Sequence, residues 1–140
     1  MTKKFNQGFT LIELLVVIAI IGILSSVVLA SLNTARGKGA DAAVKSNLNN
    51  MRAQAELFYD TGQTYTGVCG QTNMTAGQAA AVAAGGNGGT CSVNGGGTAW
   101  NAWAGLKADT AQAWCVDSFG NSKQITKAQG SALGAGVVCP

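Results

Sequence analysis

The chain has 140 residues, of which 47% are hydrophobic and only 11% charged, with a formal net charge of +3 and no histidine. The six carboxylates, the lack of histidine and the lack of a recognisable nucleophile with its base leave little material for acid–base or covalent catalysis. We therefore expect a protein that is not an enzyme and that uses no cofactor or metal.

An uncharged run extends from Leu14 to Ala35, and at about 1.5 Å per residue it forms a helix of roughly 33 Å, long enough to span a bilayer. Lys3 and Lys4 precede this run without an acid beside them. The positive-inside rule then places the N-terminus in the cytoplasm and the remainder of the chain on the far side of the membrane.

One acid, Glu13, stands at the start of this run. A carboxylate in a lipid-facing helix costs about 2.5 to 3.5 kcal/mol, so it is retained where something compensates it. A removable signal peptide cleaved near Ala30 and a simple one-pass anchor are both alternatives, but neither requires such an acid. We favour a helix whose acid pairs with a partner.

The residues around this acid resemble the N-terminus of type IV prepilins, in which a short basic leader precedes a glycine, an aromatic residue and a long apolar helix. The matching segment is Gly8-Phe9-Thr10-Leu11-Ile12-Glu13, followed by the apolar run. The resemblance covers about the first quarter of the chain.

This resemblance implies that prepilin peptidase, a membrane-embedded aspartic protease, cuts between Gly8 and Phe9 and methylates the new amine of Phe9. The ammonium of one subunit would then neutralise Glu13 of a neighbour during assembly. Loss of the leader with Lys3 and Lys4 leaves seven basic side chains against six acidic ones, a net charge of +1. Such a charge does not indicate nucleic-acid binding.

Beyond the apolar run the pattern becomes amphipathic, with apolar residues every three or four positions, which predicts that one helix continues to about Tyr59. The stretch from Gly22 to Ala30 contains weak helix formers, and both local unwinding and close helix packing stay open there. The periodic apolar positions, on which we expect the head to pack, are Ala40, Val44, Leu48, Met51, Ala55 and Phe58.

The remaining residues form a small head rich in glycine, alanine, asparagine and threonine, with four cysteines at Cys69, Cys91, Cys115 and Cys139. An even number of cysteines in an exported domain indicates disulfides, and four cysteines allow three pairings. We favour Cys69 with Cys91 and Cys115 with Cys139. The latter bridge would resemble the disulfide-bounded loop near the C-terminus of many pilins.

Within the head we expect a helix from Thr75 to Ala84, ended by Gly85 and Gly86, and then a flexible glycine loop to Thr90. Trp114 and Val116 alternate with polar residues and should face the long helix. Three predicted strands, the last two joined as a hairpin through residues 118–121, are Ala99 to Lys107, Ala113 to Asp117 and Ser122 to Thr126.

The predicted fold is therefore α+β, in which a long N-terminal helix packs on a small antiparallel sheet as in type IV pilins. We divide the chain into four parts: a leader of residues 1–8, a membrane and filament-core helix of residues 9–35, its amphipathic continuation over residues 36–60, and a disulfide-stapled head of residues 61–140.

The preferred function is that of a structural subunit of a type IV pilus, held in the bacterial inner or cytoplasmic membrane as a single-pass precursor and then polymerised into an extracellular filament. The expected partners are other pilin subunits, prepilin peptidase and the pilus assembly machinery. The resemblance implies adhesion, twitching motility or DNA uptake without choosing among them.

Two alternatives remain. A pseudopilin of a type II secretion system shares the leader and helix, and such pseudopilins more often have an acid-rich calcium site, which Asp109 and Asp117 alone do not make. An exported binding protein tethered by its helix would use Trp100 and Trp103, with Lys107, as a stacking surface.

Overall fold

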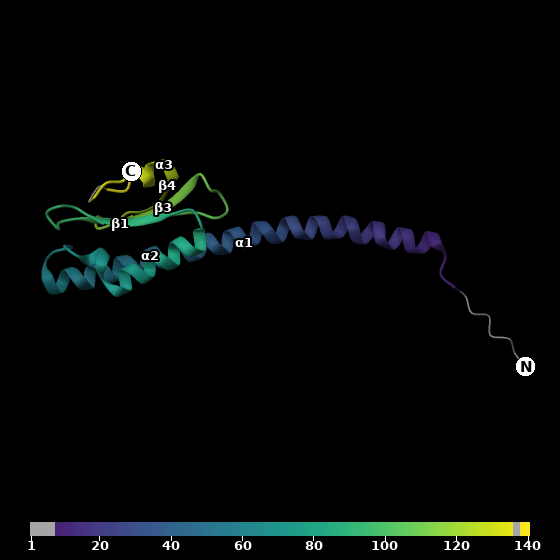
Figure 1. Ribbon diagram of the computed structural model, residues 1–140, viewed down its shortest axis with the longest axis horizontal. Helices are drawn as coiled ribbons and strands as arrows, with labels where there is room; N and C mark the ends of the chain where they lie inside the picture. Colours follow the sequence, from purple (N-terminus) through teal and green to yellow (C-terminus); the bar gives the residue numbers. More distant parts are fainter. Residues whose placement is uncertain (1–7, 136–137) are drawn as a thin grey trace, which may run out of the picture. The chain divides into compact units, whose positions relative to one another are not determined.

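The computed structural model describes residues 8–135 and 138–140. The predicted leader, including Lys3 and Lys4, lies outside the described residues except for Gly8. The chain divides into two compact units between Ala35 and Arg36, where the uncharged run of the sequence ends. The elements of both units are drawn in Figure 1.

Helix α1 (Leu11–Gly62) is continuous over 52 residues and includes both the apolar run and the amphipathic stretch, as predicted. The helix is not unwound between Gly22 and Ala30. The hydroxyl of Ser26 donates a hydrogen bond to the carbonyl oxygen of Ile23 (2.7 Å), so this polar side chain is satisfied within the helix itself.

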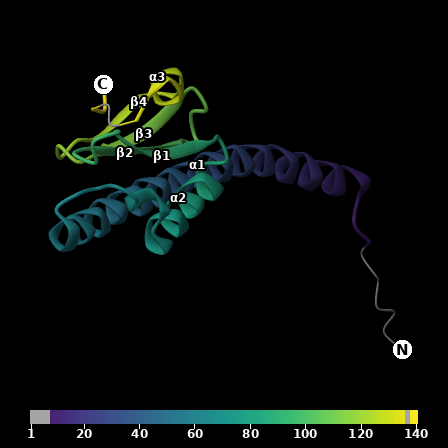
Figure 2. The ribbon, with the colours of Figure 1, turned by 60° about the vertical axis from the view of Figure 1, so that its left-hand side comes forward.

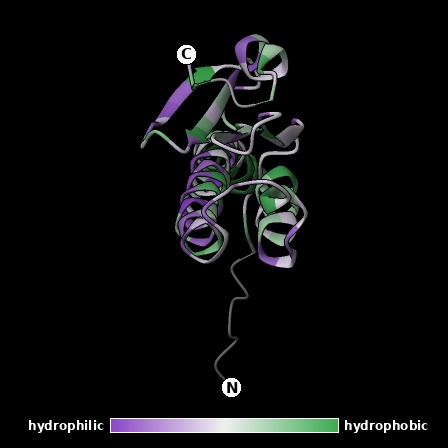
Figure 3. Ribbon diagram, turned by 90° about the vertical axis from the view of Figure 1, so that its left-hand side faces the viewer, coloured by the Kyte–Doolittle hydropathy of each residue, from purple (hydrophilic) through white to green (hydrophobic). Residues whose placement is uncertain are grey.

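In the second unit, the predicted apolar face of α1 forms one wall of the main core, with Val44, Leu48, Met51 and Ala55 buried and Phe58 partly buried. The buried residues recur at the spacing of one helix face, which is why the amphipathic pattern in the sequence predicted this face correctly. Seen along the helices in Figure 3, hydrophilic residues lie on the outer side of α1 and hydrophobic residues on the side toward α2 and the sheet.

A short helix η1 (Val68–Gly70) and helix α2 (Thr72–Gly85) follow. Helix α2 begins three residues before the predicted start and ends as expected, because Gly86 takes the left-handed conformation (φ 70°) that caps a helix. A Cβ atom on Gly85 would collide with the carbonyl oxygen of Gly105, so this glycine permits the close approach of α2 to the sheet.

Four antiparallel strands form one sheet in the order β1-β2-β3-β4. The three predicted strands are confirmed with small shifts of their ends, and β3 and β4 form the expected hairpin. The strands are β1 (Gly89–Val93), β2 (Trp100–Gly105), β3 (Gln112–Asp117) and β4 (Ser122–Thr126).

Strand β1 corrects one prediction, because the flexible loop expected up to Thr90 ends earlier. Gly89 and Thr90 are paired with Ala104 and Trp103 of β2. The sequence of β1 contains the strand-favouring residues Thr90 and Val93, but it begins with a glycine and has no clear apolar alternation, so it did not stand out as a strand without its partner β2.

Helices α1 and α2 lie side by side against one face of the sheet, and helix α3 (Lys127–Ala132) lies on the other (Figure 1 and Figure 2). Trp114 and Val116 pack against the α1 side as predicted, and the amine of Lys45 lies 4.6 Å from the centre of the Trp114 ring. This long helix beside a small antiparallel sheet confirms the α+β, pilin-like architecture.

Candidate functional site

The predicted processing site lies directly before helix α1. Gly8, Phe9 and Thr10 have no regular secondary structure, and the Phe9 side chain is 90% exposed. Among the described residues beyond Gly8 and its chain neighbours, no atom lies within 4 Å of the position that a Cβ on Gly8 would take. The Gly8–Phe9 peptide bond is therefore open to an approaching protease.

Glu13 folds back onto Thr10 and caps the helix. Its carboxylate Oε2 accepts hydrogen bonds from the backbone N–H and from the hydroxyl of Thr10, both at 2.8 Å. In return, the N–H of Glu13 donates to the Thr10 hydroxyl oxygen at 3.3 Å. This reciprocal arrangement is a capping box, with Thr10 as the N-cap residue and Glu13 three residues further on.

The capping box was missed in the sequence, although the spacing Thr10-x-x-Glu13 before an apolar run is its usual signature. It gives Glu13 a role within a single chain, because the carboxylate satisfies backbone donors at the helix N-terminus and lies at the positive end of the helix dipole. The capping box does not supply a full positive charge to neutralise this acid.

The first unit exposes an almost continuous apolar surface. Phe9, Ile12 and Ile23 are 90%, 72% and 67% exposed, and no residue of the most apolar window of α1 is buried. By length and composition, α1 is the one helix among the described residues that can cross a membrane. An apolar surface of this size requires lipid or other helices to cover it.

The four cysteines form the two disulfides that we favoured among the three possible pairings. Cys69 in η1 is bonded to Cys91 in β1, and Cys115 in β3 is bonded to Cys139 near the C-terminus. Each bridge therefore ties a segment outside the sheet to one of its strands. The Cys69–Cys91 bridge also holds the polar strand β1 that the sequence did not reveal.

The tryptophan stacking surface of the tethered-protein alternative is not present. Trp100 and Trp103 are only 1% and 5% exposed, and they belong to the cores on opposite sides of the sheet. They have this arrangement because residues three apart on a strand point to opposite faces. Both tryptophans are core residues.

The acids considered for a calcium site are engaged elsewhere. The Asp109 carboxylate accepts a hydrogen bond from the N–H of Ala111 (2.9 Å), and Asp117 is buried and accepts four hydrogen bonds from nearby N–H groups. Across residues 8–135 and 138–140, no group of three or more His, Cys, Asp or Glu side chains is placed to hold a metal ion.

A family model described as the prokaryotic N-terminal methylation motif matches residues 3–29, which contain Gly8, Phe9 and Glu13. The match covers the proposed cleavage site, the capped helix start and most of the exposed apolar run.

Two curated proteins are similar to this chain. The type IV wide pilus major component PilA4 of Thermus thermophilus is 43% identical over 60 residues, which is 43% of this chain and 46% of that protein. The type IV major pilin protein PilA of Myxococcus xanthus is 33% identical over 61 residues, which is 44% of this chain and 28% of that protein.

The chain thus spans less than half the length of either relative that it matches. No solved structure matches it significantly. Together the methylation motif and the two pilin relatives support the type IV pilin family for this chain.

Proposed function

We propose that the chain is a structural subunit of a type IV pilus. The observation that carries this proposal is the N-terminal arrangement: an open Gly8–Phe9 bond, a carboxylate at Glu13 and a helix whose apolar surface is uncovered. In this function prepilin peptidase cuts between Gly8 and Phe9 and methylates Phe9. The apolar helix is covered first by lipid and then by the helices of other subunits.

In the assembled fibre, the ammonium group of Phe9 in one subunit pairs with Glu13 of another. The capping box supplies Glu13 with hydrogen-bond donors but with no opposite charge, and a carboxylate charge in an apolar environment is costly unless an opposite charge lies beside it. The new N-terminus at Phe9, the residue directly before the N-cap Thr10, supplies that charge only after cleavage. Pairing therefore links processing to polymerisation.

Before assembly, the precursor is held in the bacterial inner or cytoplasmic membrane by α1, with the disulfide-bonded head on the exported side. Its partners are prepilin peptidase, the pilus assembly machinery and further pilin subunits. The mature filament is extracellular, and it serves adhesion, twitching motility or DNA uptake. The head is mechanical and not catalytic.

The capping box allows the charge of Glu13 to be tested separately from its hydrogen bonds. Glu13→Gln keeps an acceptor that suits the third position of a capping box but removes the charge, whereas Thr10→Ala removes the cap and keeps the charge. Fibres are sheared from cells, counted by electron microscopy and identified by mass spectrometry, and cleavage is checked by the subunit mass.

We expect Glu13→Gln subunits to be inserted and cleaved but to form fibres at no more than about a tenth of the normal yield, since loss of one paired charge corresponds to at least about tenfold in an equilibrium. Thr10→Ala subunits should still assemble. Normal assembly of Glu13→Gln would refute the charge pairing. If the unaltered protein forms no fibre and stays as monomers in the membrane, the pilus function itself is wrong.

A further inference from the structure

Two cations directly follow the uncharged run of α1. Arg36 and Lys38 are both exposed, and neither side chain makes a hydrogen bond or an ion pair with any other described residue. The fold of the head therefore does not use these two charges, and both are free to bind an anion.

The position of the two cations along the helix fits the outer edge of a membrane. Leu32 is the last exposed large hydrophobic residue of the run, and the polar residues Asn33 and Thr34 follow it. At about 1.5 Å per residue, Arg36 lies roughly 6 Å and Lys38 roughly 9 Å beyond Leu32. The headgroup layer on each side of a bilayer is about 5 to 7 Å thick. When the apolar run fills the hydrocarbon core, both long side chains therefore reach the lipid phosphates.

The loop between β2 and β3 brings a third cation to the same end of the head. The Asp41 carboxylate on α1 accepts hydrogen bonds from the N–H groups of Lys107 (2.6 Å) and Ala108 (3.2 Å). A Cβ on Gly37 would lie 3.2 Å from Ala108, so the loop rests on α1 at the residue between the two cations. Figure 1 shows this loop beside α1.

The three cations at this end are opposed by two acids. The Lys107 side chain is exposed, and its amine lies 3.4 Å from the position of a Cβ on Gly86, where α2 ends. Asp41 binds backbone N–H groups of the loop, and Asp109 accepts the N–H of Ala111 at 2.9 Å. Three positive and two negative side chains leave a net charge of +1 over residues 36–41 and 106–111. This end of the head therefore carries the charge that complements a phosphate.

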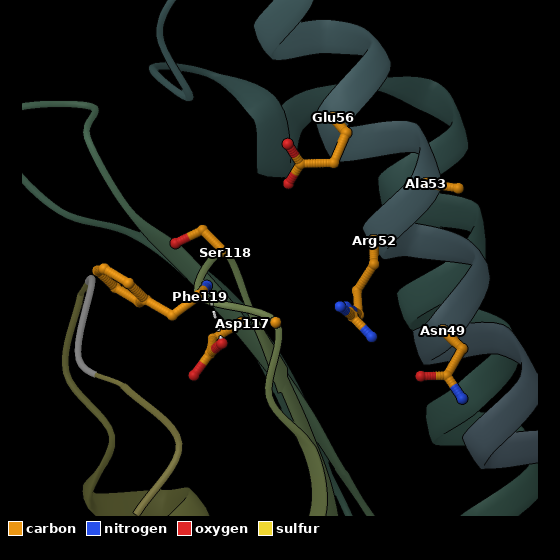
Figure 4. Close-up of a pocket in the computed structure, with 8 residues that line it drawn as sticks. Asn49, Arg52, Ala53, Glu56, Asp117, Ser118 and Phe119 are labelled. Atoms are coloured by element: carbon orange, nitrogen blue, oxygen red, sulfur yellow. Dashed lines mark hydrogen bonds between the residues drawn. The ribbon is translucent and has the colours of Figure 1, made fainter.

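Another arginine of the same helix lies far from this end. Arg52 follows Arg36 by sixteen residues, which places it roughly 24 Å further along α1. It borders an open polar cleft of about 570 Å³, together with Glu56 and the turn after β3 (Figure 4). In the close-up, the Arg52 and Glu56 side chains both extend from α1 toward the side of the turn. Arg52 lies beyond the reach of the headgroups and is a matched control for Arg36.

We propose that Arg36, Lys38 and Lys107 bind the phosphate groups of anionic lipids in the exported-side leaflet and dock the head of the precursor on the membrane surface. This inference rests on the proposed function, because it concerns the stage in which α1 spans the membrane. Each basic residue near an anionic lipid surface favours the bound state by about fivefold. These contacts hold the β2–β3 loop toward the membrane until the subunit leaves for the fibre.

Photo-crosslinking in nanodiscs tests this docking. The full-length protein is inserted as a single copy, with p-benzoylphenylalanine in place of Thr110, an exposed residue of the β2–β3 loop. The nanodiscs contain phosphatidylcholine alone or phosphatidylcholine mixed with phosphatidylglycerol, and lipid adducts are measured by mass spectrometry. We expect adducts from residue 110 in the anionic nanodiscs. The yield should be at least about fivefold lower in the neutral nanodiscs, and high salt should also lower it.

The same photoreactive residue in place of Phe119 is the positional control. Thr110 lies two residues before β3 and Phe119 lies two residues after it, so the two sites are at opposite ends of this strand. A strand of six residues separates them by roughly 20 Å. Residue 119 should therefore form no lipid adducts in either kind of nanodisc.

Single substitutions test the cations themselves. Arg36→Gln should lower the adduct yield from residue 110 by about fivefold, and Arg52→Gln should leave it unchanged. Lys107→Gln should lower the yield in the same way, with Lys123→Gln on β4 as its control. Asp109→Asn removes an opposing acid and should raise the yield. Urea unfolding of each variant excludes a folding defect.

Equal adduct yields in neutral and anionic nanodiscs, or equal yields from residues 110 and 119, would overturn the docking and leave the pilus function intact. If Arg36→Gln and Lys107→Gln lower the fibre yield but not the adduct yield, the cations bind a neighbouring subunit and the lipid contact is wrong. Failure of the unaltered protein to insert α1 across the nanodisc would instead contradict the membrane-held precursor of the proposed function.

Discussion

Replacing Asp117 with alanine removes an acceptor that connects three parts of the head. The carboxylate is buried and binds the N–H groups of the β3–β4 turn and that of Cys139. Without it, the backbone N–H groups of Asn121 and Cys139 lose their partner. The N–H of Phe119 is in an exposed turn and can bind water.

The expected loss follows from these two donors. A hydrogen bond to a charged group contributes about 1.5 to 3 kcal/mol, so Asp117→Ala should lower the free energy of unfolding by about 3 to 6 kcal/mol. Asp109→Ala is the matched control, because the Asp109 carboxylate accepts a single backbone hydrogen bond at an exposed position. It should cost less than about 1 kcal/mol.

The measurement is urea unfolding of the full chain in detergent micelles, followed by the fluorescence of the three tryptophans. If Asp117→Ala and Asp109→Ala differ by less than about 1 kcal/mol, the buried carboxylate does not stabilise the head in the way its hydrogen bonds indicate.

Three further predictions concern the head. Burial and the hydrogen bond to a neighbouring carboxylate raise the pKa of Tyr65 to about 12. The free energy of unfolding should therefore be unaffected by this group below pH 10 and should fall as the pH rises toward 12. Urea unfolding measured over this pH range should show the fall in the unaltered protein, and Tyr65→Phe should not show it. Gly85→Ala should destabilise the head by about 1 to 3 kcal/mol, because the added Cβ would clash with the sheet. Gly39→Ala is the control, and it should be neutral or stabilising because the space around Gly39 in α1 is open. Thermal unfolding of both variants measures the difference. Replacing Cys115 and Cys139 together with serine should cost about 3 kcal/mol in urea unfolding, since their bridge closes a separation of 24 residues, and an unchanged midpoint would contradict this.

The amphipathic part of the long helix could be predicted because its apolar residues repeat at the helical period. Val44, Leu48, Met51 and Ala55 recur along one helix face, and all four are buried. Strand β4 was predicted with its observed ends because turn residues bound it on one side.

Strand β1 and helix α3 could not be predicted from apolar periodicity. Strand β1 is polar and depends on its pairing with β2 and on the Cys69–Cys91 bridge. Helix α3 has six residues and begins with a second capping box, in which the N–H of Gln129 donates to the Thr126 hydroxyl oxygen at 3.2 Å. The spacing Thr-x-x-Gln was available in the sequence as a signal for this helix.

The sequence identified the candidate site through Gly8, Phe9 and Glu13, but it did not predict how these residues are arranged. The sequence presented Glu13 as an acid without a partner, and the structure shows that it also caps its own helix through Thr10. The role of Asp117 was missed for a different reason, since its four donors come from residues up to 22 positions away in the sequence.

The most direct test of the proposed function is the mass of the subunit in fibres sheared from the cell surface. We predict a chain that begins at Phe9, carries one added methyl group on its amine and contains both disulfides. Fibres built from a different protein, or a surface form of this chain that still contains Gly8 and its leader, would contradict the pilus function.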